Sequence, residues 1–153
     1  MANFAKQTNN MAKRTNAIDL SDSFEKIPVR IFPSSKEGSV FVARQIADFI
    51  REKQKEKEKC VLGLATGSTP KSLYAELVRL HREEKLSFKN VITFNLDEYY
   101  PIDNNALQSY NRFMKNQLFD HIDIDPKNIH IPNGEVKKED IKEHCRQYEK
   151  MIK

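Results

Sequence analysis

The sequence predicts an α/β protein in which a parallel β-sheet is flanked by helices. Short apolar runs alternate along the chain with segments whose apolar residues recur at helical spacing. The run CVLGLA, residues 60–65, is apolar throughout, as is typical of a parallel strand covered on both faces. This alternation of strand and helix favours parallel strands joined by right-handed crossovers.

The first expected elements follow a polar start. Residues 1–24 lack periodicity and are rich in Asn, Lys, Thr and Ser, so we interpret them as a flexible arm before a single domain over residues 25–153. The β-branched run IPVRIF, residues 27–32, predicts a strand. Ser35 can cap a helix over residues 36–55, whose apolar residues share one face: Val40, Ala43, Ile46, Ala47 and Ile50.

The second strand, residues 60–65, leads to a helix expected to start at Thr69 and Pro70. A hydroxyl side chain caps a helix well, and proline is tolerated in the first turn because its missing N–H would have no partner there. The inner face of this helix is expected to consist of Leu73, Tyr74, Leu77 and Leu80.

Later segments continue the pattern. The run NVITFNL, residues 90–96, predicts a third strand, and a helix is expected from Ser109 to about Phe119. The run NIHIP, residues 128–132, predicts a short fourth strand. A turn at Asn133–Gly134 then leads to a last helix over residues 138–153.

Composition and charge exclude several classes of protein. With 39% hydrophobic and 31% charged residues, and no apolar run near the roughly 20 residues that cross a bilayer, we expect a soluble protein with no membrane partner and no secretory signal. The net charge of +4 is not gathered in a stripe, since residues 51–59 mix five positive with three negative side chains, so no nucleic-acid partner is expected. Cys60 and Cys145 are isolated, which indicates buried or half-buried free thiols in a reducing compartment, and hence the cytoplasm.

The histidines share no spacing typical of a metal site, so no metal is expected. His81 and His144 stand among charged residues, which favours surface positions. His130 follows the strand residue Ile129, and a structural histidine is the expected role there.

The turn after the second strand, ATGSTP, has the features of an anion site. Ligands of open α/β sheets bind beyond the carboxyl ends of the strands, and Gly67 allows a sharp turn with close approach of a ligand. The following helix N-terminus favours an anion, and Thr66, Ser68 and Thr69 add hydroxyl groups. No lysine stands at Walker spacing, so a small sugar phosphate fits better than a nucleoside triphosphate. The alternative is an ordinary strand-to-helix turn without a ligand.

The run FNLDEYY places Asp97 and Glu98 at the carboxyl end of the third strand, at the same edge as this turn. A carboxylate there can act as a general base if burial, for instance beneath Tyr99 and Tyr100, raises its proton affinity. Adjacent residues point to opposite sides, so at most one of the two acids faces a ligand. The alternatives are a solvated acidic pair or a cap for the loop PIDNN.

Three separated blocks resemble, in order, the amino-terminal half of the glucosamine-6-phosphate deaminase (isomerase) family: VLGLATGSTPKSLYAEL, SFKNVITFNLDEYY and QSYNRFMKNQLFDHIDI. The resemblance covers about Ile27 to Lys153. It implies a Rossmann-like fold, incomplete relative to the family's full domain, and no redox cofactor. The related 6-phosphogluconolactonases share the glycine-containing turn but generally lack the LDEY block.

The resemblance also implies an activity, the conversion of glucosamine 6-phosphate and water to fructose 6-phosphate and ammonia. It assigns to Asp97 the transfer of a proton from C2 to C1 of the opened sugar. It assigns substrate and phosphate contacts to four residues of the turn: Thr66, Gly67, Ser68 and Thr69. A small-molecule sugar phosphate is therefore the expected partner.

Two departures from the family pattern affect these expectations. Ala65 and Ser68 stand where many members have proline and a second glycine, but both are small, so we expect the turn to persist. The family's GxGxDGHIAFNEP block, whose acid and histidine open the sugar ring, does not occur in the 153 residues. We therefore expect negligible deaminase activity from the chain by itself. An unpaired strand edge would also favour a homo-oligomer. A non-catalytic sugar-phosphate-binding module and a phosphosugar isomerase or lactonase remain as alternatives.

Overall fold

The computed structural model describes residues 29–153, so the predicted arm over residues 1–24 lies outside the described residues. This part contains a three-stranded sheet in the order β1-β2-β3, with both strand pairs parallel. The helices and strands are α1 (Ser35–Lys55), β1 (Cys60–Leu64), α2 (Lys71–Glu84), β2 (Val91–Asn95), α3 (Tyr110–Gln117), β3 (Ile129–His130) and α4 (Ile141–Ile152). Short 3-10 turns occupy Phe119–His121, Pro126–Asn128 and Lys138–Asp140.

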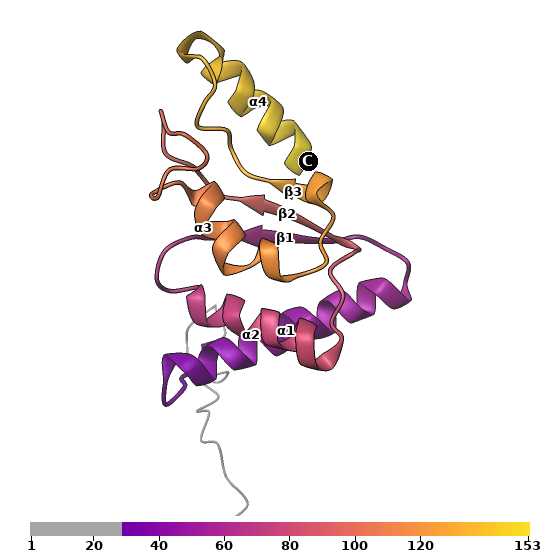
Figure 1. Ribbon diagram of the computed structural model, residues 1–153. Helices are drawn as coiled ribbons and strands as arrows, with labels where there is room; N and C mark the ends of the chain where they lie inside the picture. Colours follow the sequence, from indigo (N-terminus) through magenta and orange to yellow (C-terminus); the bar gives the residue numbers. More distant parts are fainter. Residues whose placement is uncertain (1–28) are drawn as a thin grey trace, which may run out of the picture.

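Helices lie on both faces of the sheet, which confirms the predicted α/β class. Figure 1 shows α1 and α2 together on one side and α4 on the other. The face toward α1 and α2 holds the core, to which α1 contributes Ala43, Ala47 and Ile50, and α2 contributes Tyr74, Leu77, Val78 and Leu80. On the other face, the ring of Tyr148 from α4 meets the ring of Phe94 from β2 edge-on, with centroids 5.9 Å apart. The predicted apolar helix faces thus lie toward the core, with Val40, Ile46 and Leu73 half-buried.

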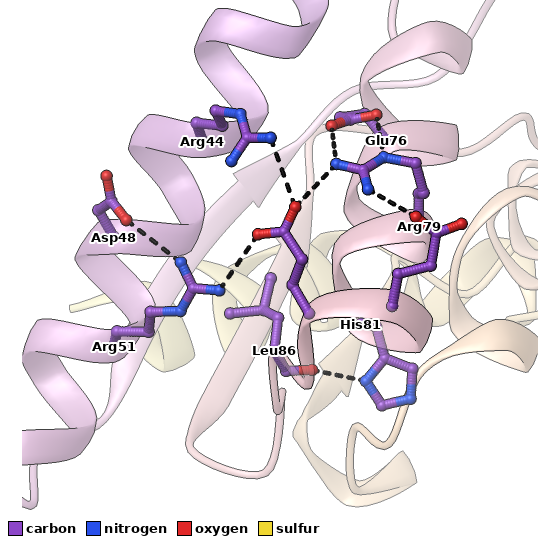
Figure 2. Close-up of polar contacts among 9 residues, drawn as sticks. Arg44, Asp48, Arg51, Glu76, Arg79, His81 and Leu86 are labelled. Carbon is purple, nitrogen blue, oxygen red and sulfur yellow. Dashed lines mark hydrogen bonds and ion pairs between the residues drawn. The ribbon is translucent and has the colours of Figure 1, made fainter.

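An ion-pair network joins α1 to α2 on the outer surface of this layer. The Glu84 carboxylate at the end of α2 lies 3.4 Å from Arg44 and 3.9 Å from Arg51 of α1, and 3.0 Å from Arg79 of its own helix. Figure 2 shows both arginines of α1 reaching toward α2. Because these groups are largely solvated, the network adds modestly to a helix contact that apolar side chains already hold.

The prediction of a strand over residues 27–32 is wrong for residues 29–32, which are the part of it that the structure describes. Arg30 makes only an isolated bridge, and Ile31 is 51% exposed. Instead, this segment packs on α1: the Phe32 and Phe41 rings lie 5.2 Å apart, and the Arg30 guanidinium lies 4.7 Å from the Phe41 ring. Side-chain contacts with a helix therefore replace the expected strand pairing.

Several element boundaries also differ from those predicted. Ser34, not Ser35, caps α1: the Ser34 hydroxyl accepts from the Glu37 N–H at 3.2 Å and donates to the Glu37 carboxylate at 3.0 Å. The last helix begins with a 3-10 turn and becomes α-helical at Ile141. Strand β3 has two residues instead of five. At the ends of β2 and β3, the Tyr148 hydroxyl of α4 lies 2.8 Å from the Asn95 carbonyl oxygen and 3.0 Å from that of His130.

Candidate active site

The carboxyl ends of β1 and β2 lie side by side, and they bring two loops together at the same end of the sheet. The parallel register pairs Leu64 with Asn95, and the Leu96 N–H donates to the Leu64 carbonyl at 3.3 Å. The β1–α2 turn (residues 65–70) and the residues after β2 therefore leave the sheet from adjacent positions. This shared edge is the arrangement expected from the sequence, and it is the usual ligand site of an open parallel sheet.

Gly67 gives the β1–α2 turn its shape. Its φ of +97° is a conformation that side chains with a Cβ rarely adopt, whereas a Cβ built there would meet nothing within 4 Å. The requirement for glycine is therefore conformational, and the space above the turn is open. Gly67, Ser68 and Thr69 are exposed and Thr66 is half-buried, so these residues are accessible to a ligand.

The predicted cap of α2 by Thr69 is wrong. Pro70 occupies the N-cap position with helical backbone angles, and no side chain caps this helix. The Lys71 N–H instead donates to the Ser68 carbonyl at 3.4 Å, and the Tyr74 N–H donates to the Pro70 carbonyl at 2.9 Å. Proline already supplies the φ that the first turn needs, so the helix starts without the Thr69 hydroxyl. That hydroxyl is thus not committed to the helix.

Tyr74 supports the turn from below. Its ring is 1% exposed, and its hydroxyl donates to the Ala65 carbonyl at the start of the turn. Burial raises the pKa of Tyr74 to about 12, so the hydroxyl keeps its proton and remains a donor at neutral pH. One residue of the predicted inner face of α2 therefore also anchors the backbone of the turn.

The two acids after β2 occupy different environments. Asp97 is exposed, and its side chain makes no hydrogen bond within residues 29–153. Burial beneath the tyrosines, the condition suggested for a raised proton affinity, is not met at Asp97, since Tyr99 and Tyr100 are themselves 53% and 44% exposed. The Tyr99 ring instead packs on Tyr110 of α3, with centroids 4.8 Å apart. Asp97 thus lies at the edge of the sheet with an accessible carboxylate.

The Glu98 carboxylate joins the two ends of the rim loop (residues 99–108) through hydrogen bonds from backbone N–H groups. Its Oε1 accepts from the N–H groups of Tyr99 and Tyr110, both at 2.9 Å, and its Oε2 accepts from the Asn111 N–H at 2.9 Å. The alternative of a cap for the loop PIDNN is not what these bonds form, because none of the donors lies in residues 101–105; Glu98 instead caps the N-terminus of α3. Ser109, predicted as the first residue of that helix, is its N-cap.

Gly134 holds the rim loop from the other side. The Ile102 N–H donates to the Gly134 carbonyl at 3.0 Å. A Cβ built at Gly134 would lie 2.7 Å from the Tyr99 carbonyl oxygen and 2.9 Å from that of Ile102. The predicted Asn133–Gly134 turn therefore requires glycine because another loop approaches it closely. Sequence alone indicates the turn but not its neighbour.

Strand β2 carries buried polar groups that sequence reasoning missed. Thr93 and Asn95 are each 2% exposed, and neither the Thr93 hydroxyl nor the Asn95 amide has a hydrogen-bond partner among the described residues. A cavity of about 180 Å³ beneath the turn is lined by Thr93, Ala65 and Pro70 with apolar side chains of α1 and α2. Polar residues at alternate positions of an otherwise apolar strand were the available signal.

The remaining candidate groups are structural in the described part of the chain. Within residues 29–153, no cluster of His, Cys, Asp and Glu could hold a metal. The His130 ring stacks on Phe94 at 4.6 Å, as expected for a structural histidine. His81 is not a free surface residue, because its Nδ1 donates to the Leu86 carbonyl at 2.6 Å, and His144 accepts from the Asn133 N–H at 3.0 Å.

The two thiols differ in exposure. Cys60 is buried, and burial raises the pKa of its thiol, whereas Cys145 is exposed. Both are free, but the expectation that Cys145 is at least half-buried is wrong. No helix of the described region combines the length and apolarity needed to cross a membrane.

Comparison with known proteins identifies the family. The model of the family described as glucosamine-6-phosphate isomerases/6-phosphogluconolactonase matches residues 33–153. This chain belongs to that family. It is 49% identical over 121 residues to the glucosamine-6-phosphate deaminase of Treponema denticola, a match that covers 78% of this chain and 44% of the relative.

Solved structures of the family confirm the predicted fold. A monomeric glucosamine-6-phosphate deaminase is 43% identical, with a TM-score of 0.72 over 78% of this chain and 47% of that structure. A 6-phosphogluconolactonase from Thermotoga maritima is 28% identical, with a TM-score of 0.61 over 75% of this chain and 50% of that structure. The chain therefore spans half or less of the length of these relatives.

Proposed function

We propose that this chain supplies the phosphate-binding turn and the proton-transferring carboxylate of a glucosamine-6-phosphate deaminase. The reaction converts glucosamine 6-phosphate and water to fructose 6-phosphate and ammonia, in the catabolism of amino sugars. The observation that carries the proposal is the pairing of Leu64 with Asn95, because it sets the β1–α2 turn and Asp97 at one edge of the sheet. The substrate is inferred from relatives that are named glucosamine-6-phosphate deaminase and are 45–49% identical to this chain.

Each group has a role that its position supports. Thr66, Gly67, Ser68 and Thr69 hold the phosphate, helped by the positive end of α2, a helix of 14 residues. Asp97 removes the proton from C2 of the open-chain sugar and returns it to C1. The resulting ketose imine takes up water and releases ammonia. No step exchanges electrons with a second molecule, so the proposal needs no redox cofactor.

The free thiols, and the lack of a membrane-spanning helix among residues 29–153, support a cytoplasmic enzyme acting on a small sugar phosphate. Strand β1 is an outer strand of the described sheet, so the side of β1 that faces away from β2 is available for pairing with another strand. The outer side of β1 could pair with a second copy in a homo-oligomer or with a further strand of the same domain. A lactonase function has weaker support, because identity to the Thermotoga maritima lactonase is 28% against 43–49% for the deaminases.

A non-catalytic sugar-phosphate-binding module is the second candidate. The observation that favours it is the exposure of the β1–α2 turn, which can bind a phosphate whether or not Asp97 acts as a base. The two candidates differ in one measurable respect. A binding module binds glucosamine 6-phosphate without releasing ammonia, both by itself and as part of a larger protein, as long as the β1–α2 turn is intact.

A chimera separates these candidates. The chain replaces the matching 121-residue portion of the Treponema denticola deaminase, and ammonia release from glucosamine 6-phosphate is measured. We expect an active chimera, and a loss of kcat of roughly 10²–10⁴-fold in Asp97→Asn with little change in KM. Asp48→Asn, which alters an exposed carboxylate of α1, is the matched control and should retain activity.

Two results would contradict the proposal. Full turnover by the Asp97→Asn chimera would remove Asp97 from the mechanism. A chimera that folds and binds glucosamine 6-phosphate but releases no ammonia would favour the binding module. The 153-residue chain alone is expected to bind the sugar phosphate with negligible turnover, because it lacks the family's ring-opening block.

A further inference from the structure

Glu98 makes more hydrogen bonds than any other carboxylate at this edge of the described sheet. Four donors surround it: the N–H groups of Tyr99, Tyr110 and Asn111, and the Ser109 hydroxyl, which lies 3.2 Å from Oε2. The Ser109 hydroxyl also lies 2.9 Å from the Asn104 carbonyl, so its single proton serves one acceptor at a time. Bonds from N–H groups to a carboxylate are strong, and the N-terminus of α3 favours a negative charge.

These bonds close the rim loop on itself. Tyr99 begins the loop and Tyr110 follows its end, and both backbone N–H groups donate to the same oxygen of Glu98. The carboxylate therefore holds together two points that are separated by 11 residues of sequence. The Gly134 carbonyl fixes the middle of the loop through Ile102. The loop is thus held by hydrogen bonds at both ends and at Ile102 between them.

Asp97 lies between two anchored neighbours. On one side the Leu96 N–H donates to the Leu64 carbonyl of β1, and on the other the Glu98 side chain is bound to α3. The Asp97 carboxylate itself has no hydrogen-bond partner within the described residues and is exposed. Its placement therefore depends on the backbone on either side, and Glu98 supplies one of the two constraints.

We propose that Glu98 is a positioning residue, which holds the backbone of Asp97 so that its carboxylate meets the carbon skeleton of a phosphosugar bound at the β1–α2 turn. The proposal rests on the proposed function, since it needs Asp97 to face the substrate. Glu98 does not touch the substrate. It acts through Asp97 by joining the end of β2 to α3.

The test uses the full 153-residue chain and two ligands. An acyclic amino-alditol 6-phosphate offers both a phosphate for the turn and an ammonium group that can pair with Asp97. Inorganic phosphate offers the phosphate alone. Their affinities are measured by calorimetry for the unmodified chain, Asp97→Asn, Glu98→Gln and the double variant. Glu98→Gln keeps the side-chain volume but turns an NH₂ group toward backbone donors. Glu139→Gln changes an exposed glutamate outside the site and is the control.

We expect Asp97→Asn and Glu98→Gln each to weaken binding of the amino-alditol phosphate roughly fivefold to tenfold, with inorganic phosphate unaffected. Because Glu98 acts through Asp97, the double variant should bind no more weakly than either single variant. Amide exchange at Tyr110 and Asn111 should accelerate in Glu98→Gln, which confirms that the cap is lost.

Other outcomes separate the two proposals. If Asp97→Asn weakens the amino-alditol phosphate but Glu98→Gln does not, or if the two losses add, the positioning role is overturned and the proposed function stands. If Glu98→Gln weakens both ligands equally, the residue serves the fold in general, and the positioning role is also overturned. If Asp97→Asn has no effect, or the chain binds neither ligand, the proposed function fails and the positioning role fails with it.

Discussion

Replacing Gly134 by alanine should displace the rim loop and destabilise the protein. A Cβ at this position would lie 2.7 Å from the Tyr99 carbonyl oxygen and 2.9 Å from that of Ile102, and it would overlap the Ile102 Cγ2. Ordinary contacts begin at 3.4 Å, so the turn and the loop must separate by about 0.7 Å at Tyr99. Two of the three contacts are with backbone oxygens, which cannot rotate away as a side chain could.

Overpacking of this kind costs about 1–3 kcal/mol, and the backbone contacts place Gly134→Ala in the upper half of that range. For a domain of this size, a loss of about 2–3 kcal/mol lowers the melting temperature by roughly 4–12 °C. Denaturant unfolding followed by circular dichroism measures the free energy directly. The displacement should also weaken binding of the amino-alditol phosphate, because Asp97 precedes the displaced loop.

The control for this substitution is Gly63→Ala in β1. A Cβ at Gly63 would meet nothing within 4 Å, and strand interiors favour alanine over glycine, so this variant should match or exceed the unmodified chain in stability. The two variants make the same chemical change with opposite expected signs. Equal stability of Gly134→Ala and the unmodified chain would refute the close approach of the rim loop to the turn.

Two further predictions concern the β1–α2 turn and the loop before η2 (Pro126–Asn128). Gly67→Ala forces a Cβ into φ +97°, which should cost about 1–2 kcal/mol and weaken phosphate binding; unchanged phosphate affinity would show that the turn is not the anion site. Burial raises the pKa of Asp123, but hydrogen bonds from the Phe88 N–H and the Ser87 hydroxyl outweigh it, so the pKa lies below its ordinary value. Its ionised form therefore stabilises the fold above the unfolded value of about 3.9, and this stability is lost as pH falls through the lower folded value. Asp123→Asn should lower stability by about 1–2 kcal/mol at pH 7, and this loss should shrink as pH falls through the folded pKa of Asp123. A loss that does not change with pH would contradict this account; His81, 3.7 Å away, is the neighbouring titratable group.

Much of the fold follows from local patterns in the sequence. The apolar run at residues 60–65 and the helical spacing of Ala43, Ala47 and Ile50 predict a strand and a helix face that the structure contains. Gly67 marks the turn because only its backbone conformation matters there. Such features depend on residues close together in the chain, so the chain alone is sufficient to locate them.

The errors arise where distant segments decide the outcome. Residues 29–32 have strand composition, but Phe41 of α1 offers Phe32 an aromatic partner, and the segment packs on the helix. Strand β3 is shorter than predicted, and at its end the Tyr148 hydroxyl of α4 contacts the carbonyl oxygens of Asn95 in β2 and His130 in β3. β-propensity describes how well residues suit a half-buried surface, and the neighbour that supplies the surface is a tertiary property.

The sequence by itself determined the parallel α/β class, the family, and the two loops that carry the candidate site. Only the tertiary structure decided that Glu98 is bound to α3 while Asp97 stays accessible, and that Gly134 must lack a side chain. The physical reason is distance along the chain. Glu98 meets three of its four donors 11 to 13 residues away, and Gly134 meets a loop more than 30 residues before it, so no local pattern records these contacts.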